Sequence, residues 1–300
     1  MKLAYAISAS PTQFQAVAST DVYETIPALA GLGFDGVELA IRDPAQVDLE
    51  PLAAAAERAG VAVPAIGTGQ AYIEEGLGLT APEEHVRVRA VARLLGQVSA
   101  ARRFGALLIV GLIHGPIPAG TDRSVAEERV VQGLGTVARA ARTAGVRLVV
   151  EPINRYESNW LNTVDEVLDL LNRLGEDNVG VLPDTFHMNI EEADLPAALR
   201  RGGPRVWHVH MADSNRRAPG WGHLAFAPVV QTLREMGYGG FASAEILQTP
   251  GVLDAAWQTI GALRRLVPRA APEVRSVEAL RAPGNGQTPR SGPGDSREVT

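Results

Sequence analysis

Four residues in the second half of the chain carry side chains that bind metals, and each follows a short apolar run. They are Glu151, Asp184, His210 and Glu245, at intervals of 33, 26 and 35 residues. Each interval is about one strand-and-helix repeat, so four successive strands would deliver three carboxylates and one imidazole to one rim. Converging carboxylates repel one another, and a divalent cation relieves that repulsion. Oxygen and nitrogen ligands without sulfur favour Mn²⁺, Mg²⁺ or Co²⁺ over a structural zinc site.

An acidic residue after a strand has a second common role, as the cap of the next helix. This alternative stays open for Asp184, because "DTFHM" could begin a turn. Glu151 and Glu245 are poorer caps, and an unpaired carboxylate is costly to bury at the end of an apolar strand. A metal site therefore explains the two glutamates better than capping does.

The stretch "HVHM" (208–211) contains two histidines on the same face of one strand. Two residues separate them by about 6.6 Å along the strand. His210 is nearer the carboxyl end, so we expect it to be the ligand. His208 is expected to lie one layer deeper, as a core residue.

The order of apolar runs and helical patterns predicts a (β/α)8 TIM barrel. Strand and helix patterns alternate, which implies parallel strands joined by helical crossovers. Eight repeats within residues 1–266 match the usual size of such a barrel, about 250 residues. An open doubly wound sheet is the alternative, but it usually has a glycine-rich turn after its first strand, and "SASPTQF" is not one. The expected strands are 3–8, 36–40, 61–67, 106–113, 146–151, 179–184, 205–211 and 240–246, with helices near 22–32, 47–59, 82–104, 122–144, 163–174, 193–201, 226–236 and 251–266.

Composition narrows the class of protein. The 300 residues include no cysteine, which excludes disulfides and thiolate chemistry, and Lys2 is the only lysine. A net charge of −6 argues against nucleic-acid binding. The first apolar run is too short for a signal peptide, and none reaches the roughly 18 residues of a membrane span, which predicts a cytoplasmic protein without membrane contact. Residues 267–300 are rich in Pro, Gly, Ser and Arg, and we expect a disordered tail there.

Three further residues follow the earlier strands and are candidates for substrate contact: Arg42, Gln70 and His114. Arg42 in "AIRDP" could bind the carboxylate of a keto acid, or could pair on the surface with Asp43 or Asp48. Backbone N–H groups of "GTGQ" (67–70) are the other candidates for binding a carboxylate.

Several motifs resemble those of the xylose-isomerase-like superfamily and, within it, the ketose 3-epimerases of the D-tagatose/D-psicose type. They are "EPINRYE" (151–157), "DTFHMNIEE" (184–192), "HVHMADSNRRAPG" (208–220) and "AEI" (244–246). In the N-terminal half, "MKLAYAISAS", "VELAIRDPAQVD" and "AIGTGQAYIEEGLGLT" resemble the 5-keto-L-gluconate epimerase of inositol catabolism. The resemblance covers residues 1–266.

The resemblance implies a Mn²⁺-type metal held by Glu151, Asp184, His210 and Glu245, with Glu151 and Glu245 also as the acid/base pair. It implies substrate contacts from Glu157, His187 and Arg216, a small-molecule substrate, and a homo-oligomer (dimer or tetramer). The implied reaction inverts the carbon next to the ketone of a ketose or a keto-hexonate (5-keto-L-gluconate or D-tagaturonate type). Two carboxylates suit it, because one removes a proton from one face and the other returns a proton to the opposite face.

Other functions share these residues. A hydroxypyruvate-type isomerase or an inosose dehydratase would begin with the same proton abstraction. A nuclease of the endonuclease IV type would need more histidine ligands and a basic groove than six histidines and a net charge of −6 provide. A non-catalytic sugar-binding barrel is the non-enzyme alternative.

Overall fold

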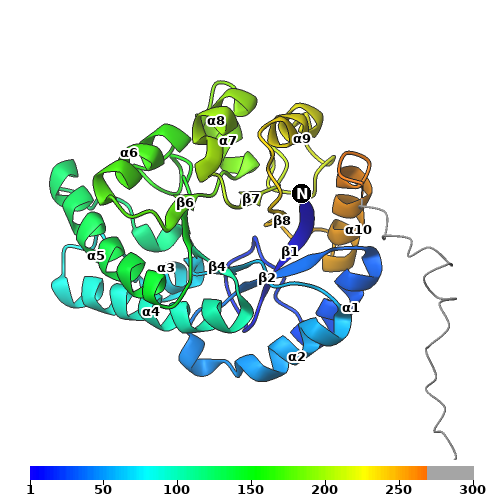
Figure 1. Ribbon diagram of the computed structural model, residues 1–300, viewed down its shortest axis with the longest axis horizontal. Helices are drawn as coiled ribbons and strands as arrows, with labels where there is room; N and C mark the ends of the chain where they lie inside the picture. Colours follow the sequence, from blue (N-terminus) through cyan, green and yellow to red (C-terminus); the bar gives the residue numbers. More distant parts are fainter. Residues whose placement is uncertain (269–300) are drawn as a thin grey trace, which may run out of the picture. The chain divides into compact units, whose positions relative to one another are not determined.

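The computed structural model describes residues 1–268, in which eight parallel strands form one sheet (Figure 1). The order within the sheet is β6-β5-β4-β3-β2-β1-β8-β7. Isolated parallel bridges from Val181 to Val206 and from Asp184 to His210 join β6 to β7, so the sheet closes. The predicted (β/α)8 barrel is confirmed. The strands are β1 (Lys2–Ser8), β2 (Gly36–Ala40), β3 (Ala65–Gly67), β4 (Leu107–Val110), β5 (Leu148–Val150), β6 (Val179–Val181), β7 (Val209–His210) and β8 (Phe241–Ala244).

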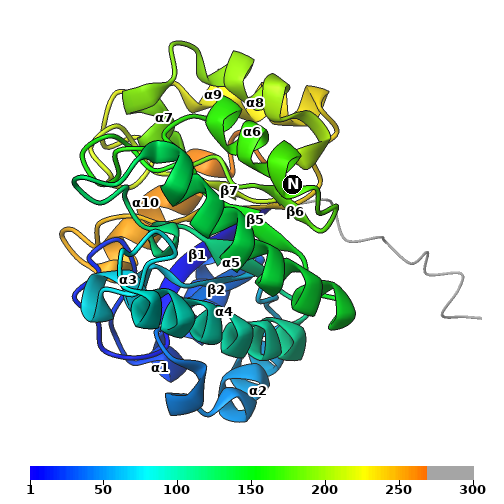
Figure 2. The same ribbon diagram turned by 90° about the vertical axis from the view of Figure 1, so that its left-hand side faces the viewer.

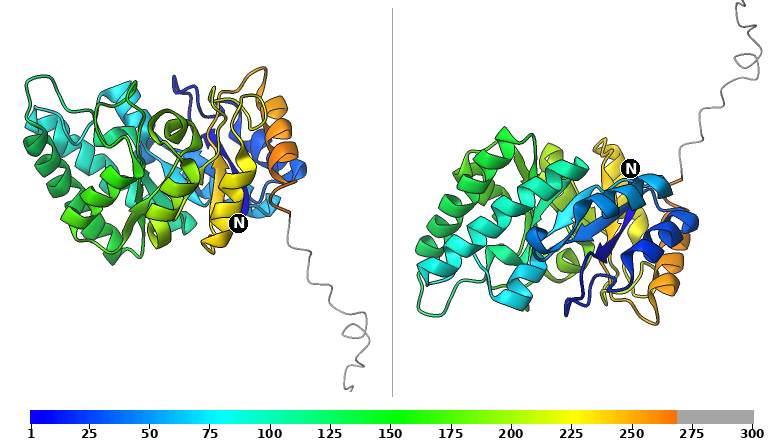
Figure 3. Two further views of the ribbon diagram at one scale, coloured as in Figure 1. Left: turned by 90° about the horizontal axis from the view of Figure 1, so that it is seen from above. Right: turned by 90° about the horizontal axis from the view of Figure 1, so that it is seen from below.

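Helices surround the strands as an outer layer (Figures 1 and 2). Long helices α4 and α5 lie side by side, and α10 packs beside α1, as Figure 3 shows from above and below. The helices that connect successive strands are α1 (Val22–Leu32), α2 (Leu49–Ala59), α4 (Glu84–Phe104), α5 (Arg123–Thr143), α6 (Val164–Leu174), α8 (Leu195–Gly202) and α9 (Phe226–Glu235). Helix α10 (Val252–Leu263) follows the last strand, β8. Within residues 1–268, no helix has the length and apolar character that crossing a membrane requires.

Two short helices were not expected from the sequence. They are α3 (Gly69–Glu75) and α7 (Thr185–Glu191), and both lie in loops that follow strands. The structure also has three 3₁₀ turns, η1 (Pro44–Gln46), η2 (Leu112–His114) and η3 (Gly203–Arg205). The expected strand 106–113 is shorter in the structure because η2 takes Leu112 and Ile113 at its end. The expected strand 205–211 is reduced to Val209–His210.

Local sequence signals explain where the elements begin and end. Thr163 and Glu166 form a capping box at the start of α6, which satisfies backbone N–H groups that a helix leaves free. Gly105 ends α4 in the left-handed region, with φ of 63°, and the chain enters β4 two residues later. The carboxyl end of β4 therefore lies at the rim of the barrel away from the end of α4.

The strands alternate between two environments. Leu3, Tyr5 and Ile7 of β1 belong to the large core under the helices, where the Tyr5 ring meets Phe34 edge-on at 5.4 Å. A smaller apolar cluster of Ala65, Ile109, Val149 and Leu182 fills part of the barrel interior. Most of the predicted tail, residues 269–300, lies outside the described residues, while Val267 is buried in the core.

Candidate metal centre and active site

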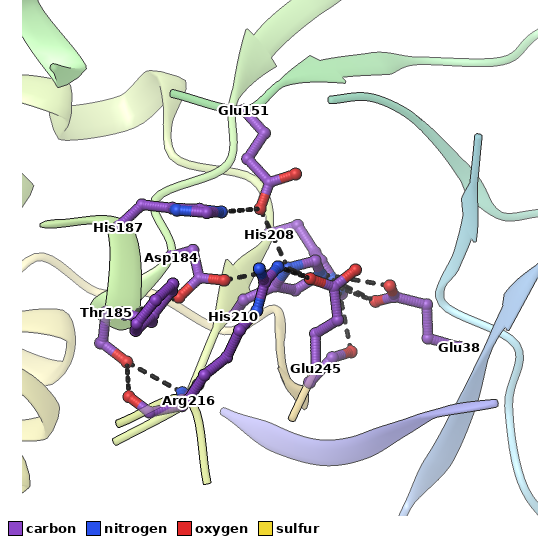
Figure 4. Close-up of polar contacts among 12 residues, drawn as sticks. Glu38, Glu151, Asp184, Thr185, His187, His208, His210, Arg216 and Glu245 are labelled. Carbon is purple, nitrogen blue, oxygen red and sulfur yellow. Dashed lines mark hydrogen bonds and ion pairs between the residues drawn. The ribbon is translucent and has the colours of Figure 1, made fainter. Parts of the chain in front are cut away.

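The four predicted ligands converge at the carboxyl-terminal rim of the barrel (Figure 4). Glu151 follows β5, Asp184 precedes α7, His210 ends β7 and Glu245 follows β8. The Nδ1 atom of His210 lies 3.3 Å from Oε1 of Glu151, 3.7 Å from Oδ2 of Asp184 and 3.9 Å from Oε2 of Glu245. One potential ligand atom from each residue lies within 4.8 Å of the others.

The unpaired atoms of this cluster show that it fits a cation. All four side chains are buried. Oε1 of Glu151, Oδ2 of Asp184 and Nδ1 of His210 have no hydrogen-bond partner, although buried polar atoms usually have one. These atoms face one another, and a divalent cation between them would satisfy all three. Their oxygen and nitrogen chemistry matches Mn²⁺, Mg²⁺ or Co²⁺.

Asp184 caps a helix and also faces the cluster, so its position is compatible with both of the roles that the sequence left open. Its Oδ1 atom accepts a hydrogen bond of 2.7 Å from the backbone N–H of Phe186 and caps α7. Its Oδ2 atom faces His210 instead. The cap fixes the orientation of the carboxylate, so the same turn that starts α7 aims the other oxygen into the cluster.

The pKa values of the cluster reflect crowded charges in a buried place. Burial raises the pKa of Glu245 to about 8, and the nearby charges of Glu151 and Asp184 add to this effect while His210 and Arg216 oppose it. Burial alone would lower the pKa of His210, but the charge of Glu38 and the nearby carboxylates of Asp184 and Glu151 raise it well above its usual range. The carboxylates around His210 therefore stabilise positive charge within the cluster.

Glu38 on β2 is a buried part of the site that sequence reasoning missed. Its Oε1 lies 3.1 Å from Nε2 of His210, and its Oε2 lies 2.7 Å from Nε2 of His208. His208 lies one layer deeper, as its spacing predicts, and also contacts Ser243. The signal in the sequence was a single carboxylate within the otherwise apolar run "GVELA".

The three predicted substrate contacts, Glu157, His187 and Arg216, lie beside the cluster and line the same cavity. Arg216 reaches Glu157 at 3.0 Å and Glu245 at 3.1 Å. Nε2 of His187 lies 4.0 Å from Oε1 of Glu151. Asn154 holds two of these residues together, because its side-chain amide lies 2.8 Å from Oε1 of Glu157 and 2.7 Å from Nδ1 of His187. That amide donates to Nδ1, so His187 presents Nε2–H towards Glu151.

The loop after β7 is built to present Arg216. This residue has a left-handed backbone with φ of 59°, which is uncommon for a residue other than glycine. Asp213, for which the sequence suggested no role, is buried and accepts hydrogen bonds from the backbone N–H groups of Ser214, Gly220 and Leu224. The backbone N–H of Arg216 in turn donates to the carbonyl of Asp213. Asp213 thus holds the loop in the conformation that directs the guanidinium inward.

A cavity lies beside the cluster, and only some of the remaining candidates line it. Among its lining residues are Glu38, Gln70, Glu151, Glu157, His187, Arg216 and Glu245. Gln70 is buried, donates to Ser8 and leaves its Oε1 without a partner. Arg42 is not a lining residue, and it pairs with Glu74 at 2.8 Å rather than with Asp43 or Asp48.

His114 also lies outside the cavity lining and is a buried residue in η2. Its Nδ1 lies 3.0 Å from the carbonyl oxygen of Gly115, and its ring meets Trp160 edge-on. Burial is the main cause that lowers the pKa of His114 to about 4. Its surroundings therefore favour the neutral imidazole of a structural residue.

Replacing His114 with leucine should make folding stability less sensitive to acid. The unfolded chain binds a proton at His114 near pH 6.5, whereas the folded chain does so only near pH 4, so acidification through this window favours the unfolded state. The stabilisation is present above about pH 6.5 and its loss amounts to about 3 kcal/mol by pH 4. Urea unfolding of the wild type and His114→Leu at about pH 7 and about pH 4 measures the difference. The exposed His85 supplies a control, His85→Leu, and equal acid sensitivity of all three proteins would contradict the prediction.

Comparison with known proteins gives the relatives of this chain. Residues 26–266 match the family described as xylose isomerase-like TIM barrel. An L-ribulose 3-epimerase of Mesorhizobium japonicum is 32% identical over 230 residues, covering 76% of each chain. A D-psicose 3-epimerase of Agrobacterium fabrum is 31% identical, covering 76% of this chain and 80% of that protein. A solved structure of an L-ribulose 3-epimerase superposes with a TM-score of 0.75 at 28% identity, covering 93% of this chain and 98% of that one.

These relatives agree with the predicted resemblance to ketose 3-epimerases, while the resemblance to an enzyme of inositol catabolism stays a prediction. The relatives are named as epimerases, which are isomerases. The match covers every strand from β2 to β8 and all four residues of the candidate metal centre. The chain therefore belongs to the xylose isomerase-like TIM barrel family.

Proposed function

We propose that this protein is a metal-dependent 3-epimerase of neutral ketoses. The observation that carries the proposal is the placement of two buried glutamates, Glu151 and Glu245, in one cluster with Asp184 and His210 beside a cavity that both glutamates line. The relatives that are named L-ribulose and D-psicose 3-epimerases support the reaction type.

The proposed reaction moves a proton between the two faces of the carbon beside the ketone. A divalent cation bound by the four residues would polarise the ketone and stabilise negative charge on its oxygen. One glutamate removes the C3 proton and the other returns a proton to the opposite face. Glu151 and Glu245 exchange the roles of base and acid when the direction reverses.

The substrate contacts follow from the hydrogen-bonding groups around the cavity. His187 presents an N–H group beside Glu151, where a substrate oxygen that gains negative charge would lie. Arg216 and Glu157 are paired, so they offer a donor and an acceptor to neighbouring hydroxyl groups. The Phe14 and Phe186 rings stack on the Arg216 guanidinium at 5.6 and 5.0 Å and limit its movement.

The charges of the cavity favour a neutral ketose over a keto-hexonate. Of the lining residues in the described part of the chain, Arg216 is the only one with a guanidinium or ammonium group, and it already pairs with Glu157 and Glu245. Arg42 pairs with Glu74 outside the lining. A substrate carboxylate would have to compete with these acidic side chains for its partner.

A panel of neutral ketoses and keto-hexonates, incubated with Mn²⁺ in D₂O and followed by NMR, tests the proposal. We expect deuterium at C3 together with the C3 epimer, for ketoses but not for keto-hexonates. Deuterium at C1 of the recovered ketose, with deuterium at C2 of an aldose product, would instead show a sugar isomerase, and loss of water a dehydratase. Metal binding without exchange on any substrate would favour a sugar-binding barrel.

A further inference from the structure

We infer that Glu38 and His208 position His210 so that its Nδ1 atom is the metal ligand. This inference rests on the proposed metal centre and concerns two residues that are not among its four ligands. Glu38 comes from β2, His210 ends β7 and His208 directly precedes β7, so the contacts join parts of the barrel that are not neighbours in the sheet. Figure 4 shows Glu38 facing the two histidines from across the barrel interior.

The hydrogen bonds determine which nitrogen of His210 carries the proton. Oε1 and Oε2 of Glu38 lie 3.1 and 3.3 Å from Nε2 of His210. An ionised carboxylate only accepts hydrogen bonds, so Nε2 must carry a hydrogen. The lone pair of a neutral His210 is then on Nδ1, the atom that faces Glu151, Asp184 and Glu245. Glu38 therefore selects the tautomer that can bind a metal at the cluster.

His208 keeps Glu38 in place. The Glu38 side chain is 3% exposed, and a carboxylate that is buried so deeply needs donors for both oxygens. Nε2 of His210 donates to Oε1 over 3.1 Å, and Nε2 of His208 donates to Oε2 over 2.7 Å. The His208 nitrogen also lies 3.0 Å from the Ser243 hydroxyl on β8. The carboxylate is thus held between two imidazoles from one short segment, His208 just before β7 and His210 at its end.

Glu38, His208 and His210 could also be considered as a second metal site, because they lie close together. The distances favour hydrogen bonds. Two ligands bound at about 2.1 Å to one ion lie more than about 3 Å apart, whereas 2.7 Å between Glu38 and His208 is a normal charge-assisted hydrogen bond. Each Glu38 oxygen has a donor, while the unpartnered atoms of Glu151, Asp184 and His210 all lie in the other cluster.

Glu38→Gln is the sharpest variant, because it keeps the shape of the side chain but replaces one acceptor oxygen with an NH₂ donor. Glutamine can accept from one imidazole only, and its NH₂ group then favours the Nδ1–H tautomer of the other. We expect Mn²⁺ to bind Glu38→Gln about 10- to 100-fold more weakly than wild type. Ser243→Ala is the matched control, since Ser243 is equally buried and contacts His208 but not Glu38. Its affinity should stay within about threefold of wild type.

The experiment is calorimetric titration of the metal-free proteins with Mn²⁺, combined with ¹⁵N NMR of histidine-labelled, Mg²⁺-loaded wild type. The NMR measurement needs no variant, and it should show His210 with hydrogen on Nε2 and none on Nδ1. Unchanged affinity in Glu38→Gln, hydrogen on Nδ1 of His210, or two Mn²⁺ ions per wild-type chain would each overturn the inference while the proposed metal centre stands. Failure of the wild type to bind any Mn²⁺ would overturn both.

Discussion

Replacing Glu151 or Glu245 with glutamine is expected to lower the rate of epimerisation by about 10²- to 10⁴-fold. Glutamine has nearly the same size and can still occupy the cluster, but it cannot take up or release a proton at catalytic pH. Both residues are also expected metal ligands, so the metal content of each variant must be measured beside its kcat. The comparison is made at saturating Mn²⁺.

Proton exchange distinguishes two bases from one. If Glu151 and Glu245 act on opposite faces of C3, each variant keeps one base and should exchange the C3 hydrogen of one epimer without converting it to the other. The two variants should therefore retain exchange on opposite epimers, measured by NMR in D₂O. Loss of exchange on both epimers in one variant, with normal exchange in the other, would point to a single base.

A matched control lies near the same rim. Glu191 ends α7 and binds Arg155 at 2.7 Å, and it is absent from the cavity lining. Glu191→Gln should therefore keep its rate of epimerisation within about twofold of wild type. A loss similar to that of the cluster variants would show that the effect comes from charge at the rim rather than from proton transfer.

Removal of the metal should abolish epimerisation and also destabilise the fold. The cluster holds three carboxylates close to one imidazole, and a bound cation would offset their repulsion. A ligand present at 100 times its Kd stabilises the folded state by about 2.7 kcal/mol. For a barrel of this size that corresponds to a rise in Tm of roughly 5 to 10 °C.

Thermal unfolding of chelator-treated protein, with and without added Mn²⁺, Mg²⁺ or Co²⁺, measures this stabilisation. The ion that restores both Tm and activity at the lowest concentration identifies the preferred metal. Asp184→Asn should lose the metal-dependent rise in Tm, while Glu191→Gln should keep it. Full activity after exhaustive chelation, verified by elemental analysis, would contradict the proposed role of the metal.

Much of the site could be predicted from the sequence because a strand end is a local feature. Glu151, His210 and Glu245 each lie at or directly after the end of a short apolar strand, and the repeat length places those ends on one rim of a parallel barrel. The same alternation separates His208 from His210 by one layer. The capping role of Asp184 was also local, since it depends on the next two residues.

Tertiary structure alone decided which side chains meet across the barrel. Glu38 and His208 are 170 residues apart, and their contact depends on how far each strand is shifted along its neighbours when the sheet closes. Arg42 similarly pairs with Glu74 because α3, which the sequence did not predict, carries that glutamate to it. Residue order along the chain determines which strand ends carry ligands. The closure of the barrel and the packing of its loops determine the partners that orient those ligands, because these contacts form only after distant strands have come together.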